Sequence, residues 1–297
     1  MDNKGKKLKV EGLNKRIGDF ELKDINFELK PGVVTGLIGV NGCGKTTLMR
    51  TLMGSYIKDS GKLSYVDDNG NENEVSDIKK ELGFILESFP FSKNYSAINI
   101  GKLYGIYYDD FDYKKYMDLL NEYNVTLEKP NVLMSTGERI KIEIAFALSH
   151  KSSIYIMDEP VGNLDVVFRD KFYKIIREIV SDEVSSILIS SHIIGELEDV
   201  IDEVIWMNDG KIFFNGSIEE LRDSYRILEV DKEDVIMIPS DMVVGSRVRE
   251  YSSEVLIKIN EIKDLDNLSD VLRDKIRFAE LKEIIYFVEK ARENREV

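Results

Sequence analysis

The apolar positions of the chain fall into short runs separated by segments with helical spacing. The run from Val33 to Val40 is almost continuously apolar, which is typical of a central strand that a parallel sheet buries on both faces. Similar runs recur, at intervals filled by helical patterns, in Ser152–Asp158, Ser185–Ser191 and Glu203–Asp209. Because strands and helices alternate, the pattern predicts an α/β fold with a parallel sheet.

The segment after residue 87 breaks this alternation. Before it, Phe20–Val40 contains two strand-like stretches, and Lys62–Val66 and Leu82–Leu86 are further predicted strands. From Ser88 to His150 no strand pattern is present, and three stretches carry helical spacing. The spacing therefore predicts a mostly helical insertion over about residues 88–150.

The pattern changes again beyond about residue 222. Strand-like segments follow one another there, and the chain ends in an amphipathic helical pattern with Leu281, Ile284, Ile285 and Val288 on its apolar face. The predicted strands are Tyr225–Val230, Val235–Pro239 and Val248–Ile259. We expect a first domain over residues 1–221 and a small α+β extension over residues 222–297.

The charge balance narrows the classes of partner. The 297 residues include 41 Lys and Arg against 55 Asp and Glu, a formal net charge of −14. Phosphates of DNA and RNA attract the opposite sign, so we expect no nucleic-acid partner, whereas a nucleotide needs only a local cradle of donors. With 43% hydrophobic residues, the chain has ample apolar material for a folded core.

Signals for secretion and membrane insertion are missing from the pattern. The N-terminal segment is basic but lacks the apolar stretch of a signal peptide, and no apolar run approaches the roughly 18 residues of a membrane helix. Cys43 is the single cysteine, so no disulfide can form within the chain. We expect a cytoplasmic protein that does not itself span a bilayer.

A glycine-rich segment after the first buried strand carries the strongest chemical signal. Gly39–Thr46 fits the pattern G-x-x-x-x-G-K-[ST], with a predicted strand before it and a helical pattern after it. The glycines let backbone N–H groups turn toward phosphate oxygens, Lys45 adds a positive charge, and Thr46 offers a hydroxyl to Mg²⁺. The predicted nucleotide-binding residues of this loop are Asn41, Gly42, Cys43, Gly44, Lys45, Thr46 and Thr47.

Cys43 within this loop admits two interpretations. The simpler one is that a tightly packed loop needs a small side chain at this position, and cysteine is small. The other is that Lys45 and the helix N-terminus activate the thiol and make it sensitive to oxidation.

Two carboxylates follow the predicted strand that ends at Met157. In that position Asp158 can hold Mg²⁺, usually through water, and Glu159 is placed to polarise an attacking water as a general base. Two acids after a strand are common in proteins, but the phosphate loop upstream makes this pair a specific signal.

With these motifs in this order, the chain resembles the ATPase subunits of ABC transporters over roughly residues 8–220. The place of the family signature L-S-G-G-Q is taken by Met134-Ser135-Thr136-Gly137-Glu138. The D-loop is resembled by Gly162-Asn163-Leu164-Asp165, and the switch-histidine motif by Ser190-Ser191-His192. The resemblance implies a P-loop ATPase core, a small antiparallel β-subdomain, a helical insertion and an α+β tail. It also implies that Ser135, Gly137 and Asp165 contact nucleotide, and that His192 acts in catalysis together with Glu159 and Lys45.

The resemblance further implies the partners of the chain. In that family two ATPase chains face each other head to tail, and each ATP lies between the phosphate loop of one chain and the signature of the other. The implied cofactors are ATP and Mg²⁺. The implied partners are a second ATPase chain, identical or different, and separately encoded transmembrane permease subunits at the inner face of the cell membrane.

Several positions depart from the family pattern. Thr136 replaces the first glycine of the signature and Glu138 its glutamine, while Glu87 stands at the Q-loop position, where its oxygen can still serve Mg²⁺ or water. The aromatic residue that stacks on adenine falls near Ile17, which has no π face, and Phe20 is the nearest substitute. We therefore expect looser adenine binding.

These departures, the length and the C-terminal extension resemble one branch most closely, the ATPase subunits of bacterial exporters for antibiotics, lantibiotics and toxic peptides, such as phenol-soluble modulins. The leading hypothesis is an ATP hydrolase that powers a membrane exporter through ATP-dependent dimer closure. The alternatives are a soluble ABC-type ATPase without a membrane partner and a regulatory subunit that only binds ATP. Glu159 argues against the regulatory subunit, because such chains often lack the base.

The helical insertion and the extension leave their roles open. Tyrosines are frequent between Tyr95 and Tyr123, where they either pack the helical segment or line a groove for a coupling helix of a permease. The resemblance points to Phe89, Phe91 and Tyr95 as contacts of that groove. The extension can regulate the ATPase, stabilise a dimer or cap the core, and the sequence does not distinguish these roles.

Overall fold

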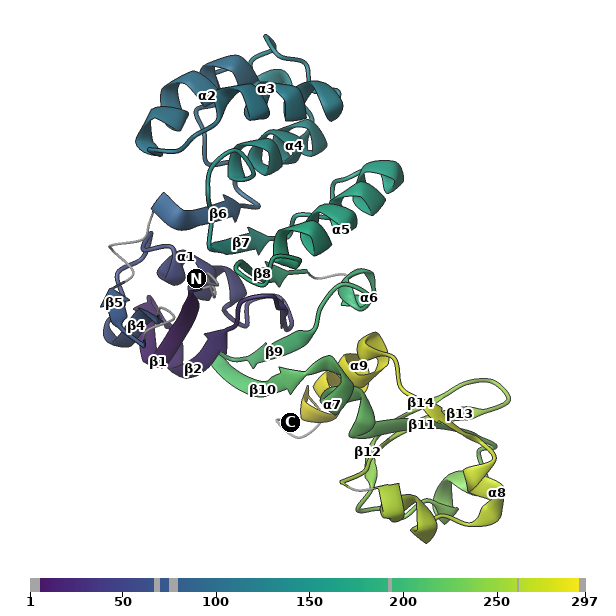
Figure 1. Ribbon diagram of the computed structural model, residues 1–297. Helices are drawn as coiled ribbons and strands as arrows, with labels where there is room; N and C mark the ends of the chain where they lie inside the picture. The colour runs from purple at the N-terminus through teal and green to yellow at the C-terminus, as the bar shows by residue number, and fades with distance from the viewer. Residues whose placement is uncertain (1–5, 67–69, 75–79, 192–193, 261, 294–297) are drawn as a thin grey trace. The chain divides into compact units, whose positions relative to one another are not determined.

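The computed structural model describes residues 6–66, 70–74, 80–191, 194–260 and 262–293 (Figure 1). The chain divides into two compact units, residues 1–193 with 199–215, and residues 194–198 with 216–297. The first unit contains a mixed six-stranded sheet, an antiparallel sheet and the helical insertion, and the second contains a smaller antiparallel sheet. In the described part of the chain, no helix has both the length and the apolar character needed to cross a membrane.

A six-stranded sheet forms the centre of the first unit. Its strands are β3 (Val34–Ile38), β6 (Leu82–Ile85), β7 (Ile154–Asp158), β8 (Ser186–Ser190), β9 (Glu203–Asn208) and β10 (Lys211–Ser217). They lie in the order β10-β9-β3-β8-β7-β6, and the pairs from β9 to β6 are parallel. β3, β7 and β8 are buried along their whole length. The parallel sheet predicted from the apolar runs is confirmed.

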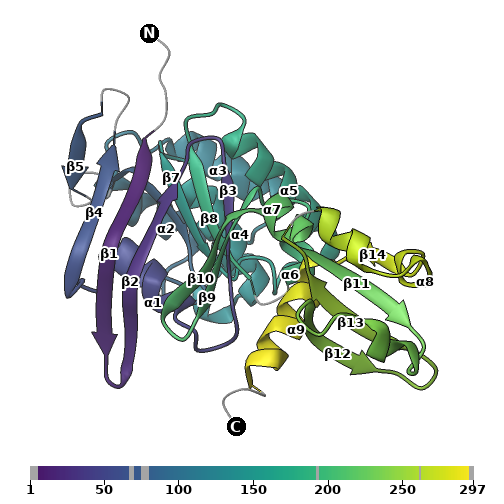
Figure 2. The ribbon, with the colours of Figure 1, turned by 90° about the horizontal axis from the view of Figure 1, so that it is seen from below.

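A four-stranded antiparallel sheet accompanies the parallel one. Its strands are β1 (Lys7–Ile17), β2 (Phe20–Leu29), β4 (Ser60–Val66) and β5 (Glu72–Glu74). Figure 2 shows them side by side in the order β2-β1-β4-β5. The apolar pattern did not predict β1, because register shifts between Val10 and Lys15 interrupt its alternation.

One hydrophobic core joins these two sheets. α1 (Lys45–Leu52) begins directly after the phosphate loop, and its buried Leu48 and Met49 belong to the same apolar cluster as Leu22 of the antiparallel sheet and Ile156 of the parallel sheet. Each Å² of apolar surface that these side chains bury contributes about 25 cal/mol, and this burial holds α1 against both sheets. The phosphate loop is thereby anchored at the carboxyl end of β3.

The segment predicted to be helical contains three α-helices. They are α2 (Ala97–Tyr104), α3 (Tyr113–Glu122) and α4 (Thr136–Ala147). They pack in sequence order, and α4 also contacts β6, so it attaches this layer to the edge of the parallel sheet (Figure 1). A further helix, α5 (Val166–Val180), follows β7 and packs on β8.

The second unit is built on a four-stranded sheet in the order β12-β13-β11-β14. Its strands are β11 (Tyr225–Val230), β12 (Val243–Val248), β13 (Ser253–Lys258) and β14 (Ile276–Phe278), and its helices are α6 (Ile194–Leu197), α7 (Ile218–Asp223), α8 (Asp270–Arg273) and α9 (Leu281–Glu293). α9 packs on β12 and β13 through the predicted apolar face, on which Leu281 and Ile284 are fully buried.

Two strand predictions in this unit are wrong. Val235–Pro239 is not a strand: Asp234–Met237 forms a 3-10 turn, in which Ile236 is 89% exposed. Ile238 is buried in the core of this unit and Val235 packs against that core, so the run contributes to the core without the alternation of a strand. Val248–Ile259 is not one strand either. β12 ends at Val248, and a turn, in which the Arg249 N–H donates to the Ser252 carbonyl oxygen at 2.8 Å, leads into β13.

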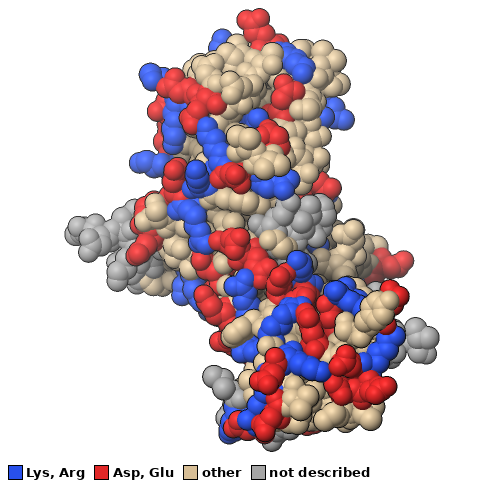
Figure 3. Space-filling view, turned by 90° about the vertical axis from the view of Figure 1, so that its right-hand side faces the viewer, with Lys and Arg blue, Asp and Glu red and all other residues tan. Residues whose placement is uncertain are grey.

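Charged side chains of both signs share the surface. On the face shown in Figure 3, Lys and Arg lie among Asp and Glu, and the described residues there form no extended basic patch.

The buried carboxylate of Glu254 is predicted to stabilise the second unit. It lies on β13, 3% exposed, and accepts a hydrogen bond from Arg247 Nε at 2.9 Å, while Arg249 pairs with its other oxygen. We expect Glu254→Ala to lower the free energy of unfolding by about 2 kcal/mol, because two guanidinium groups lose their partner. Urea unfolding measures the effect, and the exposed Glu250→Ala is the control. Equal stability of the two variants would contradict this assignment.

Candidate functional site

The phosphate loop is closed by glycines at positions where a side chain has no room. A Cβ on Gly39 would lie 2.3 Å from the Met207 carbonyl oxygen, and one on Gly44 would lie 2.6 Å from Cζ of Phe20. Both glycines also have positive φ, 147° and 111°. The loop therefore approaches β9 and β2 more closely than any other residue type allows.

Lys45 and Cys43 occupy different sides of this loop. The Lys45 ammonium group donates to the Gly39 carbonyl oxygen at 2.7 Å, so the side chain curls over the loop. Cys43 is 3% exposed and belongs to the apolar core beside α1. Its burial fits the interpretation that the loop needs a small side chain here.

A cavity of about 500 Å³ opens above the loop. It lies at the carboxyl ends of the parallel strands, where ligands of open α/β sheets bind, and its size is ordinary for a small-molecule site. Its lining comprises Ile17, Phe20, Asn41, Gly42, Gly44, Lys45, Thr46, Thr47, Glu87, Glu159, Gly162 and Asn163. Residues predicted from four separate stretches of sequence are thus brought together.

The two acids after β7 have different environments. Asp158 is 4% exposed and accepts a hydrogen bond from the Ser190 hydroxyl at 2.7 Å. The same hydroxyl oxygen accepts a hydrogen bond from the Glu159 N–H at 3.0 Å, which ties β7 to β8. Glu159 adopts a left-handed backbone with φ of 53° and lines the cavity. A non-glycine residue in this conformation is uncommon and is often found at functional sites.

The donors predicted for Mg²⁺ are all oxygen atoms, as this ion prefers. Thr46 and Glu87 line the cavity, whereas Asp158, the last residue of β7, is not among its lining residues. In the described part of the chain, no group of three or more His, Cys, Asp or Glu residues is placed to hold a metal ion. Mg²⁺ at phosphate sites is held by one or two carboxylates together with phosphate oxygens and water, so this donor set fits an ion that arrives with its nucleotide.

The signature-like segment forms the beginning of α4. Ser135 is its N-cap: the Ser135 hydroxyl accepts from the Glu138 N–H at 3.2 Å, and Glu138 Oε2 accepts from the Ser135 N–H at 2.9 Å. This backbone hydrogen bond and the Lys129 ammonium group, 3.2 Å from the same oxygen, hold the pKa of Glu138 below its usual value. Glu138 thus completes a capping box, with Lys129 balancing its charge.

Ser135, Gly137 and Asp165 do not line the cavity of their own chain. A Cβ on Gly137 would lie 2.8 Å from the Asn163 carbonyl oxygen, so the signature turn packs against the D-loop segment. Asp165 is the N-cap of α5, accepting from the Phe168 N–H at 2.9 Å, and this hydrogen bond lowers the pKa of its carboxyl. The cap was missed in the sequence, although Asp directly before a helical pattern is a strong signal for one. His192 lies outside the described residues.

Aromatic residues of the helical segment pack mainly against one another. The ring of Phe91, which is 6% exposed, lies 5.4 Å from that of Phe89 and 5.0 Å from that of Tyr104, between centroids. Tyr95 lies 6.4 Å from Tyr104 and, like Phe89, is partly exposed. Packing therefore accounts for Phe91, while Phe89 and Tyr95 retain surface for a partner.

One buried carboxyl near the cavity escaped the sequence analysis. Glu143 on α4 is 2% exposed, and its Oε2 accepts a hydrogen bond from the Leu86 N–H at 2.7 Å. Burial raises the pKa of this carboxyl to about 8. The signal in the sequence is a single acid in the apolar run Ile142–Ala147, a position where a helix buries its side chains.

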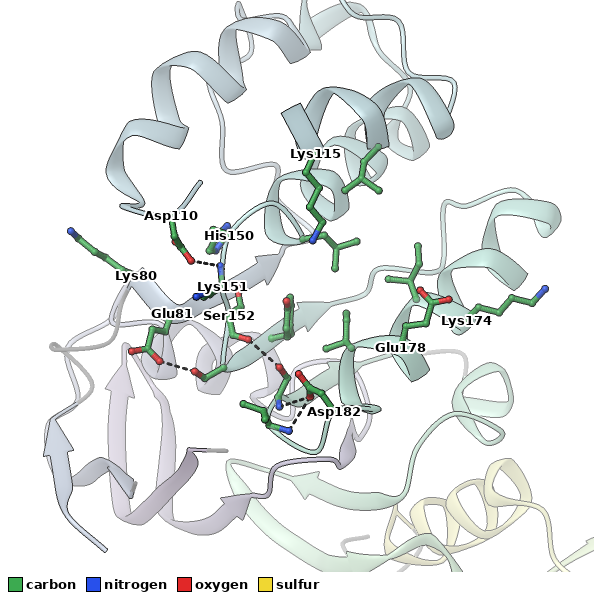
Figure 4. Close-up of a pocket in the computed structure, with 18 of the residues that line it drawn as sticks. Lys80, Glu81, Asp110, Lys115, His150, Lys151, Ser152, Lys174, Glu178 and Asp182 are labelled. Atoms are coloured by element: carbon green, nitrogen blue, oxygen red, sulfur yellow. Dashed lines mark hydrogen bonds between the residues drawn. The ribbon is translucent and has the colours of Figure 1, made fainter. Parts of the chain in front are cut away.

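A second and larger cavity, of about 1,200 Å³, lies at the opposite ends of the same strands (Figure 4). Six lysines and six carboxylates line it, so its wall carries no net charge. Among them, Lys80 pairs with Asp109 at 2.7 Å, and Asp110 accepts from the Lys151 N–H at 2.9 Å. None of the residues predicted to bind nucleotide or Mg²⁺ or to act in catalysis is among those that line it.

Comparison with known proteins agrees with this geometry. A family model described as ABC transporter matches residues 22–162. A putative ABC transporter ATP-binding protein of Mycoplasma pneumoniae is 30% identical over 224 residues, 72% of this chain and 68% of that protein. The galactose/methyl galactoside import ATP-binding protein MglA of Fusobacterium nucleatum is 33% identical over 91% of this chain and 54% of its own length. A dimeric structure of the ATP-binding cassette MJ0796 with ADP and Pi has a TM-score of 0.62 and 18% identity, covering 71% of this chain and 98% of its own, which is a likeness of fold.

The raised pKa of Glu143 predicts a pH-dependent stability. The folded chain holds this proton up to about pH 8, whereas an unfolded glutamate releases it near 4.5. Between these values the folded state binds more protons, so its stability falls as pH rises, at most by about 1.4 kcal/mol per pH unit. Glutamine does not ionise, so the Glu143→Gln variant should not lose this stability as pH rises. The free energy of unfolding of the variant, relative to that of the native protein, should therefore rise from pH 5 to 8.

Urea unfolding of both proteins at pH 5, 6, 7 and 8 measures this difference. Parallel stability curves over that range would show that Glu143 ionises at an ordinary pH in the folded chain.

Proposed function

Because this chain belongs to the ABC transporter ATP-binding proteins, whose members couple ATP hydrolysis to transport, we propose that the cavity above the phosphate loop is its half of an ATP site. The observation that carries this proposal is the convergence of Lys45, Thr46, Glu87 and Glu159 on one cavity from separate parts of the chain. A phosphate cradle, a cation, oxygen donors for a metal and a candidate base are the parts that phosphoryl transfer to water requires.

The residues then act as follows. Backbone N–H groups of the loop and the Lys45 ammonium group bind the β- and γ-phosphates, for which Lys45 leaves the Gly39 carbonyl oxygen. Thr46, Asp158 and Glu87 would hold Mg²⁺, which neutralises charge on the phosphates when it is bound. Glu159 accepts a proton from the water that attacks the γ-phosphorus, while the bond to the bridging oxygen of ADP breaks. His192 enters this scheme only through the resemblance of its motif.

Ser135, Gly137 and Asp165 serve the second half of the site in this proposal. They lie outside the cavity of their own chain, and Ser135 is exposed at the N-terminus of α4, where backbone N–H groups can bind an anion. A head-to-tail partner would bring its nucleotide to this surface. The cassette MJ0796, solved as a dimer with ADP and Pi, supports a dimer by analogy.

Glu159→Gln tests the ATP sandwich. The change removes the proposed base and keeps the shape of the side chain, so ATP should persist and a closed dimer should accumulate. We expect light scattering to show twice the monomer mass with Mg-ATP and the monomer mass without it. Lys45→Ala in the same background is the control, because it weakens phosphate binding and should stay monomeric.

A monomer in both conditions, with ATP bound, would rule out the self-sufficient homodimer. It would favour a dimer that forms only with a different ATPase chain or with membrane subunits.

We also propose that the chain drives a separately encoded permease from the inner face of the membrane, and that the substrate is an antibiotic or toxic peptide that is exported. Support comes from the departures at Thr136, Glu138, Glu87 and Ile17, from the C-terminal unit, and from the partly exposed Phe89 and Tyr95, which suit a contact with a coupling helix. MglA is named as an import protein, so direction is the feature that needs measurement.

Inside-out vesicles containing this chain and the membrane protein encoded beside it measure the direction. That neighbour should have about six apolar stretches of roughly 20 residues. We expect ATP to drive a labelled lantibiotic into the vesicles, Glu159→Gln to abolish uptake, and Phe89→Ala to reduce it. Tyr251→Ala, at an exposed position of the second unit, is the control.

Efflux of substrate from preloaded vesicles would identify an importer. A neighbouring gene without apolar stretches, combined with ATPase activity that no membrane protein alters, would favour the soluble alternative.

A further inference from the structure

β6 is the edge strand of the six-stranded sheet, so only one of its sides is held by a neighbouring strand. Its pairing with β7 runs from Leu82 to Ile85 and stops there. The next residues are Leu86 and then Glu87, which lines the ATP cavity. The position of Glu87 therefore depends on what fixes the backbone just beyond the last strand pair.

α4 and the turn after it supply that support through two polar side chains. Glu143 Oε2 accepts from the Leu86 N–H at 2.7 Å, at the end of β6. At the start of the same strand, Nε2 of His150, just beyond α4, lies 3.4 Å from the Leu82 carbonyl oxygen. Both side chains are buried, Glu143 at 2% and His150 at 6% exposure. Glu143 of α4 and His150 in the turn after it thus hold the two ends of β6, on the side that has no strand partner.

The same helix begins at the signature. Ser135, the N-cap of α4, lies eight residues before Glu143, so one rigid element runs from the surface proposed for the partner's nucleotide to the backbone beside Glu87. We propose that Glu143 is a positioning residue for ATP hydrolysis, whose hydrogen bond to Leu86 fixes Glu87 relative to the signature end of α4. The inference rests on the proposed ATP site and adds a residue that contacts no nucleotide.

The surroundings of Glu143 favour a neutral acceptor. β6 presents no ionisable side chain, α3 turns the buried Tyr116 and Leu120 inward, and Arg139, one turn earlier on α4, is the charged group whose field acts on Glu143. Burial raises the pKa of the carboxyl to about 8, so it is mostly protonated at neutral pH. A glutamine can therefore replace it as an acceptor for the Leu86 N–H.

Three substitutions separate the hydrogen bond from the packing. Glu143→Gln keeps the acceptor at the same reach, Glu143→Asp shortens the reach by one methylene, and Glu143→Ala removes the acceptor. We expect the Gln variant to retain the native kcat, and the Asp and Ala variants to lose about tenfold in kcat, the rate equivalent of one buried hydrogen bond. KM for ATP should change little, because the phosphate loop is untouched.

Tyr116→Phe is the matched control. It removes another fully buried hydrogen bond of the helical segment, from the Tyr116 hydroxyl to the Ala97 carbonyl oxygen at 2.9 Å, without touching β6. We expect it to lower stability and leave kcat unchanged. A kcat loss in this control equal to that of Glu143→Ala would reduce Glu143 to a structural role and overturn the proposal.

Hydrogen exchange gives a readout that does not depend on catalysis. In the Asp and Ala variants the Leu86 amide should exchange about tenfold faster or more, whereas in the Gln variant it should stay protected. Unchanged protection at Leu86, or equal kcat in all three variants, would contradict the proposal. If the native protein hydrolysed no ATP, the proposed function would fail, and exchange at Leu86 would still decide whether the tether exists.

Discussion

The Met207 carbonyl oxygen occupies the place where a side chain on Gly39 would begin, 2.3 Å from the position of its Cβ. This close approach sets the path of the phosphate loop between β3 and α1. Gly44 repeats it against Phe20, and Gly210 against the Glu21 carbonyl oxygen at 1.9 Å. Gly39 thus brings the loop against β9, while Gly44 and Gly210, in the turn after β9, bring the loop and that turn against β2 of the antiparallel sheet. The loop can follow this path because glycine has no Cβ at these close contacts.

The two predicted contact surfaces for a partner chain share one architectural device. Ser135 and Asp165 are N-caps, of α4 and α5, and each accepts a hydrogen bond from its own helix. Glu138 completes a capping box where the family pattern has glutamine, and Lys129 balances the added charge. The departure therefore preserves the local structure of the signature. Both helix N-termini keep their positive ends toward solvent, where an anion gains most from them.

Local patterns predicted the parts of the molecule that depend on local chemistry. The apolar runs of β3, β7 and β8 and the glycines of the loop carry their structure within a few residues, so the parallel sheet and the phosphate loop followed from sequence. The strand prediction for Val235–Pro239 failed because a 3-10 turn brings Val235 and Ile238 to the core and leaves Ile236 exposed, an arrangement that the apolar run does not reveal. Glu143 was missed for the same reason: its partner, the Leu86 N–H, becomes a neighbour only when α4 packs on β6. Register and edge position are tertiary properties that no short pattern contains.

The single thiol of the chain lies beneath the phosphate loop, with Cys43 only 3% exposed. The surface is consequently without native cysteine side chains. An engineered cysteine at any exposed position would be the one thiol open to a fluorophore or a spin label, with the phosphate loop left as it is. Two labelled copies could then report the distance between them as nucleotide binds and is released. The burial of one small side chain thus leaves no native thiol on the surface to react with the label.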